Sequence, residues 1–583
     1  MALFQRAAPI TTIAGKQPSV QPGRWLIGGA CLLELLYLLL IVSSSISELP
    51  LSSTPLVPIW SQLLPPSQFP LSFIETLLVR YTWLSPILMG LLLFGLITTY
   101  IYIVLAALRI KSPQQIPRRY LYHLLGGILL FGLTLLLMPR IFSDDVFNSM
   151  FSGRIFAVYG ADPLNNAPIQ FQYFDDPYLT WVTSGRTSHN IYGALWLFVA
   201  IVLAVVNNIP LVSLFLFKVL ALLLHLLNCV LIWKILGRLA PQRRFLGTLL
   251  YGWSPLTLIE LAGNGHNEGL LMCLLLLATW LCILLNEQMA RQAPSKQLQE
   301  LPAGQSGRPS FWNRPWFLRL SMLLAISMAS SVNLIALLVA PLYIWFDLRT
   351  ERSSGRIVLG FSWRLLVVLL PMLLLMLPFW RGSDTFFSIT SAVDMAHFVY
   401  SPINVLAAPL RSIFLAAAGP HLPSFLNPAL AADATVRASA TFIFILIYAR
   451  RFSKIRHVQA EQITGTPTTN ALPAPLAGFD TLLSSSAIAI FSYMLLVSGW
   501  FWPWYILWLF WLVALRRLDT LTSTILILSC SALFIYTFVG FSRTPLATYQ
   551  TAVIFGIPLV YLVVVKSRER YMERTRKADA RRS

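Results

Sequence analysis

Long apolar runs separated by short polar segments cover most of the chain. A helix that crosses a membrane needs about 20 mostly apolar residues. By this criterion the expected spans are 24–44, 85–108, 120–138, 209–235, 245–262, 267–286, 317–331, 333–347, 363–380, 434–450, 481–499, 504–515, 520–540 and 549–566. Of these, 317–331 and 333–347 are short, so they form either two half-helices or one kinked hairpin. The pattern predicts an all-α polytopic integral membrane protein with about 12–14 transmembrane helices.

Composition and charge support a membrane protein and argue against a nucleic-acid-binding one. Hydrophobic residues make up 57% of the 583 and charged residues only 11%, whereas soluble domains are far more polar. The net charge is +20, but the basic residues lie in short runs between apolar segments rather than in one patch. The five cysteines all lie in apolar runs without ligand-like spacing, so we expect small core or lipid-facing residues.

The basic loops predict the orientation of the chain in the membrane. Positive loops face the cytoplasm, and six segments are strongly basic: "LRIKSPQQIPRR", "KILGRLAPQRR", "DLRTERSSGR", "ARRFSKIR", "LRRLD" and the tail "KSRERYMERTRKADARRS". If the apolar run 191–206 crossed the membrane, "GRLAPQRR" and every later basic loop would be external. We therefore expect 191–206 to lie along, or dip into, the external interface, which makes both termini cytoplasmic.

With this orientation the polar segments that carry candidate chemistry lie outside. They are 47–83, 140–190, 263–268, 381–432 and 499–505. The cytoplasmic loops hold little besides positive charge and a Gln/Pro/Gly-rich linker. Any catalytic or binding site is therefore expected on the external face.

The segment "SDDVFNSMFSGR" follows an apolar run and predicts an amphipathic helix lying on the interface. Asp144 and Asp145 stand at its start, where a carboxylate caps the helix and meets the dipole favourably. We interpret Asp144 mainly as a cap. A carboxylate at the lip of a membrane cavity can also act as a general base toward a hydroxyl, and we assign that role to Asp145.

The segment "LIELAGNGHNE" places His266, Asn267 and Glu268 at the end of a span, after glycines that allow a tight break. Ionisable groups at the end of a membrane span are typical of a functional site. We expect His266 to hydrogen-bond a phosphate and Glu268 to orient the substrates. The alternative is a polar linker that satisfies its own backbone. Glu260 is interpreted as a structural partner.

Two further segments contain candidate binding residues. Arg381 ends a span and either clamps a phosphate or anchors the helix at the interface, and His397 follows in the next loop. In "GWFWPWY" most aromatic residues are typical of a membrane-interface belt. Trp504 and Tyr505 are additionally candidates for binding a sugar or an isoprenoid tail.

The first of these motifs, "SDDVFNSMFSGR … GADPL … AP", resembles the first external loop of GT-C fold glycosyltransferases. It is most similar to that of the bacterial polyprenyl-phosphate-mannose-dependent mannosyltransferases. The resemblance implies that Asp145 is the catalytic base and that Gly153-Arg154 is the family's Gly-Arg step. The sequence departs from the pattern at four positions: Ser149 and Ser152 replace a Tyr and an Asp, and Asp162 and Leu164 replace an Asn and a Tyr.

The segment around His266 resembles the family's Glu-Leu-Ala-Gly-x-Gly-His-Asn-Asp sequence, with Glu268 in place of the Asp, and "WY" at 504–505 matches a Trp-Tyr step. A family lysine is replaced within Ser331-Val332-Asn333. The resemblance covers residues 120–511. It implies a GT-C-like catalytic module over 120–380, with interfacial helices in its external loop 139–190. The apolar and basic segments predict N-terminal transmembrane helices over 1–119, an external loop and C-terminal helices over 381–566, and a basic cytoplasmic tail over 567–583.

The function implied is an inverting glycosyltransferase of the cell membrane that moves a hexose, mannose being favoured, from a polyprenyl-phosphate sugar to an external glycan or glycolipid. Asp145 would take the acceptor proton while the phosphate leaves, stabilised by His266, Arg154 or Arg381. Membrane lipids are expected partners. Neither a metal nor a cofactor is required, although Asp145 and Glu268 could share a metal ion.

Two other classes of function remain open. A transporter or flippase is the main alternative, and its best support is Lys218 and His225, seven residues apart on one helix face. An assembly protein without activity would leave the external polar loops unexplained.

Overall fold

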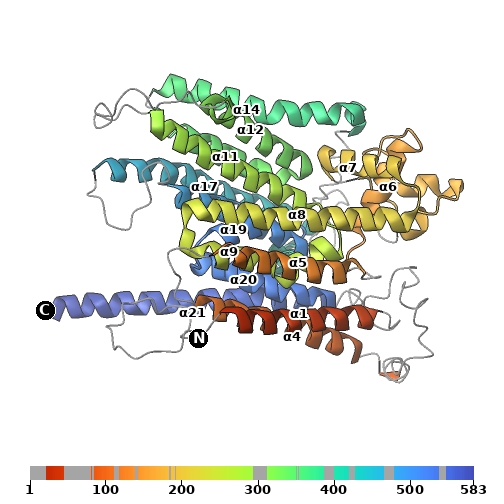
Figure 1. Ribbon diagram of the computed structural model, residues 1–583, viewed down its shortest axis with the longest axis horizontal. Coiled ribbons are helices and arrows are strands. Elements are labelled where there is room, and N and C mark those ends of the chain that lie inside the picture. The colour runs from red at the N-terminus through yellow and green to blue at the C-terminus, as the bar shows by residue number, and fades with distance from the viewer. Residues whose placement is uncertain are drawn as a thin grey trace.

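The protein is a bundle of helices with a smaller helical layer at one end (Figure 1). The computed structural model describes residues 22–44, 80–81, 84–109, 117–137, 142–182, 185–190, 192–292, 311–349, 351, 353–385, 400–418, 427–464, 478–537 and 546–582. Across these ranges the regular structure is helical, and the only strand-like pairing is an isolated antiparallel bridge between Tyr400 and Trp500. The all-α prediction is therefore confirmed.

Eleven helices in the described ranges are long and apolar enough to cross a membrane. They are α1 (Pro22–Ser44), α4 (Leu84–Leu108), α5 (Arg119–Leu136), α8 (Pro210–Leu239), α11 (Glu268–Gln292), α12 (Pro315–Val332), α14 (Ser354–Met376), α17 (Pro428–Thr464), α18 (Phe479–Leu496), α20 (Thr520–Leu533) and α21 (Leu546–Arg582). The short helices η9 (Leu377–Phe379) and η12 (Phe534–Thr537) extend α14 and α20.

Three of the expected spans are built from short or bent helices. Residues 241–263 form η5 (Pro241–Arg243), α9 (Arg244–Gly252), α10 (Pro255–Leu258) and η6 (Ile259–Gly263), with a 52° bend between α9 and α10, and would make a twelfth span. The expected spans 333–347 and 504–515 are the short pairs η8 (Leu334–Leu338) with α13 (Ala340–Asp347), and η11 (Pro503–Ile506) with α19 (Leu507–Leu515). The described part of the chain therefore agrees with the lower end of the predicted 12–14.

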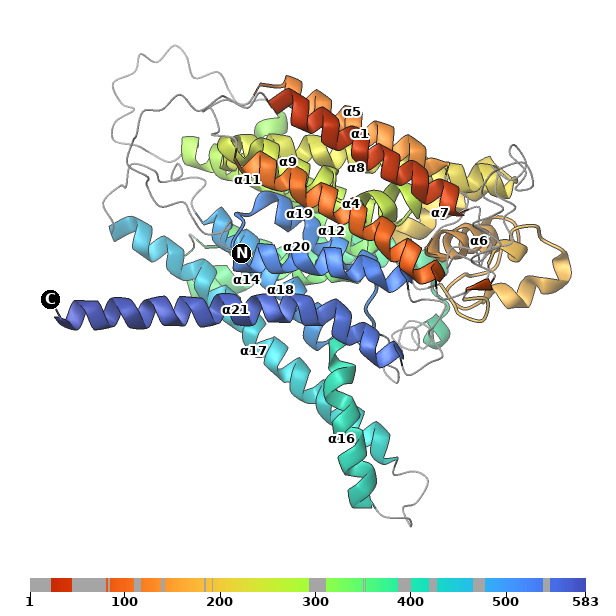
Figure 2. The same ribbon diagram turned by 90° about the horizontal axis from the view of Figure 1, so that it is seen from below.

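The helical layer at one end of the bundle comes from the first long polar loop and the apolar run after it (Figure 1). It contains α6 (Asp145–Ala157), η3 (Pro168–Phe174), η4 (Leu179–Trp181) and α7 (Ala194–Val206). At 1.5 Å per residue the 13 residues of α7 extend about 20 Å, less than the ~30 Å of a bilayer core. Because α7 lies beside α6 at this end in both ribbon views, it belongs to the end layer rather than to the set of long spans (Figures 1 and 2).

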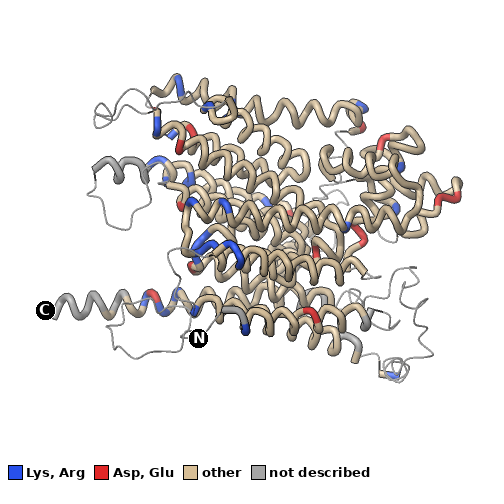
Figure 3. The backbone as a smooth tube through the Cα atoms, in the orientation of Figure 1, with Lys and Arg blue, Asp and Glu red and all other residues tan. Residues whose placement is uncertain are grey.

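Charge is distributed unevenly along the bundle axis. Most Lys and Arg residues lie at the end opposite α6 and α7 (Figure 3). The helix α21 runs unbroken to Arg582 and extends beyond the bundle at that same end (Figures 1 and 2). We call this the basic end.

A helical hairpin projects sideways from the bundle. It consists of α16 (Pro402–Ala418) and the first part of α17 (Figure 2). Arg411 and Asp433 join its two arms through an ion pair of 2.6 Å.

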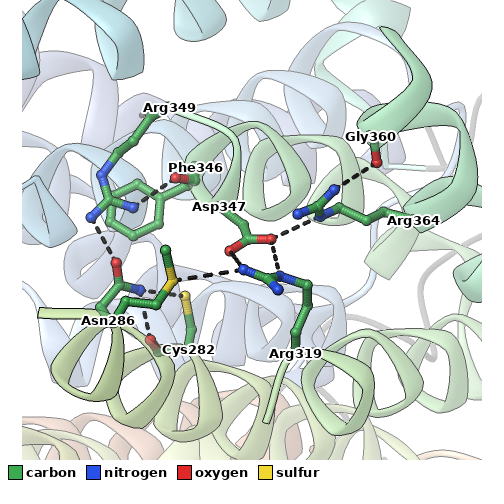
Figure 4. Close-up of polar contacts among 9 residues, drawn as sticks. Cys282, Asn286, Arg319, Phe346, Asp347, Arg349, Gly360 and Arg364 are labelled. Carbon is green, nitrogen blue, oxygen red and sulfur yellow. Dashed lines mark hydrogen bonds and ion pairs between the residues drawn. The ribbon is translucent and has the colours of Figure 1, made fainter. Parts of the chain in front are cut away.

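A buried ion network holds four helices together near the basic end (Figure 4). Asp347, at the end of α13, accepts hydrogen bonds from Arg319 of α12 at 2.7 Å and from Arg364 of α14 at 2.8 Å. Just beyond, Arg349 donates to Asn286 of α11 at 2.7 Å. The Asp347 side chain is only 1% exposed, so its charge depends on the two guanidinium groups.

We expect Asp347→Asn to destabilise the protein by about 3–5 kcal/mol, because it leaves two buried or partly buried guanidinium groups facing a neutral amide. Thermal unfolding in detergent micelles measures the loss. The matched control is Glu351→Gln, whose 3.7 Å pair with Arg356 is exposed on the arginine side and is worth at most about 1 kcal/mol. Equal melting temperatures for the two variants would contradict a structural role for the network.

Candidate active site

Asp145 is the first residue of α6, nine residues after the last residue of α5. Its backbone N–H donates to Ser143 Oγ at 3.3 Å. Asp144 takes the N-cap position, but its side chain makes no capping hydrogen bond. Its backbone carbonyl instead accepts the N–H of Phe147 at 3.0 Å. The helix start therefore fixes the position of Asp145 without using the carboxylate of Asp144 as a cap.

The second half of the site is the break between η6 and α11. The π-helical turn of η6 ends at Gly263, and Gly265 has a φ of +72°, a conformation that suits glycine. A side chain at Gly265 would also lie 3.3 Å from Val146 of α6. The close approach of Gly265 to α6 therefore brings His266 beside the start of that helix.

Glu260 holds this break in place. Its carboxylate accepts hydrogen bonds from Tyr536 Oη of η12 and from Asn264 Nδ2, the latter at 2.7 Å. The Asn264 side-chain oxygen in turn accepts the N–H of Phe142 at 3.2 Å, and Phe142 stacks on Tyr536. The interpretation of Glu260 as a structural partner therefore matches its contacts, which reach both the break and the segment that leads to Asp145.

His266 lies at the centre of three carboxyl groups, which we call the His266 cluster: Asp145, Glu260, His266 and Glu268. Its Nδ1 is 4.0 Å from Asp145 Oδ2 and 3.6 Å from Glu268 Oε2, and its Nε2 is 3.4 Å from Glu260 Oε2. These separations exceed those of direct hydrogen bonds. They are short enough for small rotations, or a substrate oxygen between the groups, to complete proton-sharing contacts.

Burial within the cluster is graded. Glu260, His266 and Glu268 have side chains at most 4% exposed, while the Asp145 side chain is 28% exposed. Removal from water, and then the negative charge of Asp144, raise the pKa of Asp145 to about 7. A carboxyl group with a pKa near neutrality is suited to act as a general base. Asp145 is the most accessible carboxyl of the cluster.

An aromatic wall covers one side of the cluster. The Trp504 ring of η11 stacks on His266 with ring centroids 4.6 Å apart, and Trp502 stacks on Trp504 at 5.1 Å. Tyr400 packs edge-on against Trp502. Four segments distant in sequence therefore meet here, and the predicted residues Asp145, His266, Glu268 and Trp504 are brought together.

The Gly-Arg step of α6 has structural contacts instead. A Cβ on Gly153 would lie 2.3 Å from the backbone oxygen of Ala200, so glycine permits the close packing of α6 on α7. Arg154 forms a buried ion pair with Asp176 at 2.8 Å and lies over the Tyr178 ring. It stands nine residues from Asp145, roughly 13 Å along the helix. Its guanidinium is engaged within the end layer, away from the His266 cluster.

The remaining residues predicted to bind substrate are Asn267, Tyr505, Arg381 and His397. Asn267 precedes α11 and accepts the N–H groups of Leu270 and Leu271 through its backbone carbonyl. Tyr505 follows Trp504 in η11. Arg381 is exposed, near enough to Asp162 to influence the pKa of its carboxyl. His397 lies outside the described residues.

Several contacting residues were not identified from the sequence. Tyr536 and Asn264 donate hydrogen bonds to the Glu260 carboxylate, and Tyr192 donates to the Asp145 backbone carbonyl at 3.2 Å. Asp162, which replaces a family Asn, accepts the N–H of Leu164 at 2.9 Å, as an Asx-turn requires. Asp162 and Asn264 bond to partners two and four residues away, whereas Tyr536 and Tyr192 contact segments far from them in the chain and have no local sequence signal.

The two residues that favoured a transporter have ordinary structural partners. Lys218 donates to the carbonyls of Leu135 and Leu136 at the end of α5, and His225 pairs with the Gly252 carbonyl at 3.0 Å. A cation at a helix C-terminus is favourable. These contacts give both residues a role in helix packing.

Within the described ranges, no group of three or more His, Cys, Asp or Glu side chains is arranged to hold a metal ion.

One known family matches the part of the chain that contains the His266 cluster. Residues 61–349, close to half of the chain, match the family model "Alpha-(1->6)-mannopyranosyltransferase, N-terminal domain". This range contains all four members of the His266 cluster. No curated protein and no solved structure matches the chain. The match over residues 61–349 is consistent with a mannosyltransferase family of the GT-C fold.

Proposed function

We propose that the protein is an inverting glycosyltransferase that transfers mannose from a polyprenyl-phosphate donor to a glycan or glycolipid acceptor. The observation that carries the proposal is the His266 cluster. A partly exposed carboxyl with a raised pKa lies 4.0 Å from a buried imidazole, inside a domain of a mannosyltransferase family.

In the proposed reaction, Asp145 accepts the proton of the acceptor hydroxyl as its oxygen attacks the anomeric carbon of the donor. The bond from that carbon to the phosphate oxygen breaks, and the phosphate keeps the electron pair. Phosphate is a good leaving group, so no second acid has to protonate it, unlike the leaving alcohol in glycoside hydrolysis. His266 is assigned to hydrogen-bond the departing phosphate.

The aromatic wall supports a sugar-bearing lipid as donor. Trp502 and Trp504 present stacked rings beside His266. Aromatic faces pack well against the apolar faces of sugars and against isoprenoid chains. We assign Trp504 to the wall of the donor site, and Tyr505, the next residue of η11, to the same wall.

The orientation belongs to the same proposal. With the basic end in the cytoplasm, as the positive-inside bias favours, the His266 cluster faces outside. Nucleotide sugars are absent there, so a donor carried by a membrane lipid fits that side. Both termini are then cytoplasmic.

We expect Asp145→Asn to lower kcat by at least about 100-fold, because the amide cannot accept the acceptor proton. The assay uses the purified protein, radiolabelled polyprenyl-phosphate mannose and a mannan-like oligosaccharide or glycolipid acceptor. Donor binding, followed by equilibrium binding of the labelled lipid, should change little.

The matched control is Asp175→Asn, an exposed acid of the same loop whose φ of 48° an asparagine tolerates well. This variant should transfer mannose at the wild-type rate. Wild-type transfer by Asp145→Asn would remove Asp145 as the base. Failure of the wild type to transfer from any polyprenyl-phosphate sugar would reject the proposed function itself.

The pKa of Asp145 predicts the pH dependence. The base works only when deprotonated, so kcat/KM should rise with pH through about pH 7 and then level off. Asp144 contributes to the raised pKa. We therefore expect Asp144→Asn to move this rise to lower pH while leaving the plateau nearly unchanged. A pH profile identical to that of the wild type would show that Asp144 does not tune the base.

A further inference from the structure

A group of three arginines at the basic end contains one, Arg516, that is buried, unlike the exposed positive charges around it. It consists of Arg243, just before α9, and Arg516 and Arg517, just after α19. Arg243 lies within electrostatic range of both other arginines and of Asp480. We call Arg243, Arg516 and Arg517 the arginine triad.

Close helix packing explains why these residues meet. A Cβ on Gly247 of α9 would lie 2.4 Å from the backbone oxygen of Ala514 of α19, so the two backbones nearly touch. Arg243 is one turn before Gly247, and Arg516 is two residues after Ala514. The contact therefore places the start of α9 beside the end of α19, with an arginine on each.

Arg516 is buried but incompletely satisfied. Its side chain is only 4% exposed. One amino group binds Asp519, which also caps α20 by accepting the Thr522 N–H at 2.8 Å. The Nε and Nη1 atoms of Arg516, and the Nη1 of Arg243, are buried with no hydrogen-bond partner among the described residues. Leaving such donors without an acceptor costs free energy.

The polarity of α9 and the few carboxylates nearby leave an excess of positive charge at the arginine triad. The helix α9 has no acidic residue in its first turn and no side-chain cap, although its N-terminus carries positive partial charge. The carboxylates near the triad are Asp519 and Asp480, and Asp480 is 3.4 Å from the exposed Arg517. Three guanidinium groups and a helix start thus face two carboxylates.

The positive-inside bias accounts for exposed arginines at this end, such as Arg517 and Arg568. It does not account for a guanidinium that is withdrawn from water with two of its donors unmatched. Guanidinium groups pair with phosphate through parallel hydrogen bonds, and helix N-termini also bind anions.

We propose that the arginine triad binds a phosphate group at the basic end of the bundle. Arg516 forms the floor of the site, and Arg243 and Arg517 form its sides. The phosphate belongs either to the headgroup of an anionic phospholipid in the adjacent leaflet or to free inorganic phosphate. The two sources share the same chemistry at the triad and differ in the acyl chains.

The test measures thermal unfolding of the full chain under two pairs of conditions. Nanodiscs of phosphatidylcholine alone are compared with nanodiscs containing phosphatidylglycerol, and detergent samples in sodium phosphate with samples in sodium chloride of equal ionic strength. A ligand that binds only the folded protein raises the melting temperature. A rise with phosphatidylglycerol alone identifies a lipid headgroup, and a rise in detergent with phosphate identifies a site that accepts the free ion.

In Arg516→Gln the rise should fall to less than about half of the wild-type value, because the floor of the site is lost. Arg568→Gln is the matched control, since it removes one exposed positive charge from the same end. It should keep the full rise. If Arg516→Gln does not fold, Arg243→Gln decides the question in the same way.

Two results would overturn the proposal. One is the same rise in the wild type, the triad variant and the control, which would indicate general attraction to a basic surface. The other is no rise of the wild type with either phosphate source.

Discussion

The carboxylate of Glu260 is the contact on which the site depends. A break in a membrane span exposes backbone groups that the bilayer cannot satisfy, so irregular backbone at this depth needs partners inside the protein. Within the break, the N–H groups of Asn264, Gly265 and His266 donate to backbone carbonyls of η6. The Glu260 carboxylate ties the break to its surroundings by accepting from the side chains of Tyr536 and Asn264, and Asn264 reaches on to Phe142 at the entry to α6. The same interaction therefore stabilises the break that carries His266 and fixes the segment that carries Asp145.

The two ends of the bundle have different chemistry. At one end, α6 and the break after η6 bring acids and an imidazole together beside an aromatic wall. At the other end, arginines dominate, and the most buried of them are held by Asp347 and Asp519. The two sets of charges are therefore separated along the bundle, one at each end. The proposed catalytic role of the first end and the proposed anion-binding role of the second are therefore independent of each other.

Much of the fold could be predicted from the sequence because apolar runs of about 20 residues leave few alternatives in a membrane. The place of α7 also followed, since the alternation of basic loops left no room for another crossing. The meeting of Asp145 with His266 and Glu268 was predictable only through the resemblance. Long-range pairs could not be predicted from the sequence. Glu260 and Tyr536 are 276 residues apart, and the residues around each of them give no sign of the other.

Arg154 shows the limit of motif reasoning most clearly. In sequence it follows Gly153 in a segment that resembles the family's Gly-Arg step, which makes it a candidate for the donor phosphate, yet its guanidinium pairs with Asp176, 22 residues later. Trp504 is the opposite case. Its run of aromatic residues is typical of an interface belt, but one of its rings stacks on His266. In both, the partner is set by packing between segments rather than by local pattern.

The most direct test of the central claim is an experimental structure with a non-transferable polyprenyl-phosphonate mannose analogue bound. If the proposed mechanism holds, the phosphonate lies within hydrogen-bond reach of His266, and the anomeric carbon faces the Asp145 carboxylate with room for one hydroxyl between them. A phosphonate bound away from His266, with the sugar out of reach of Asp145, would contradict it.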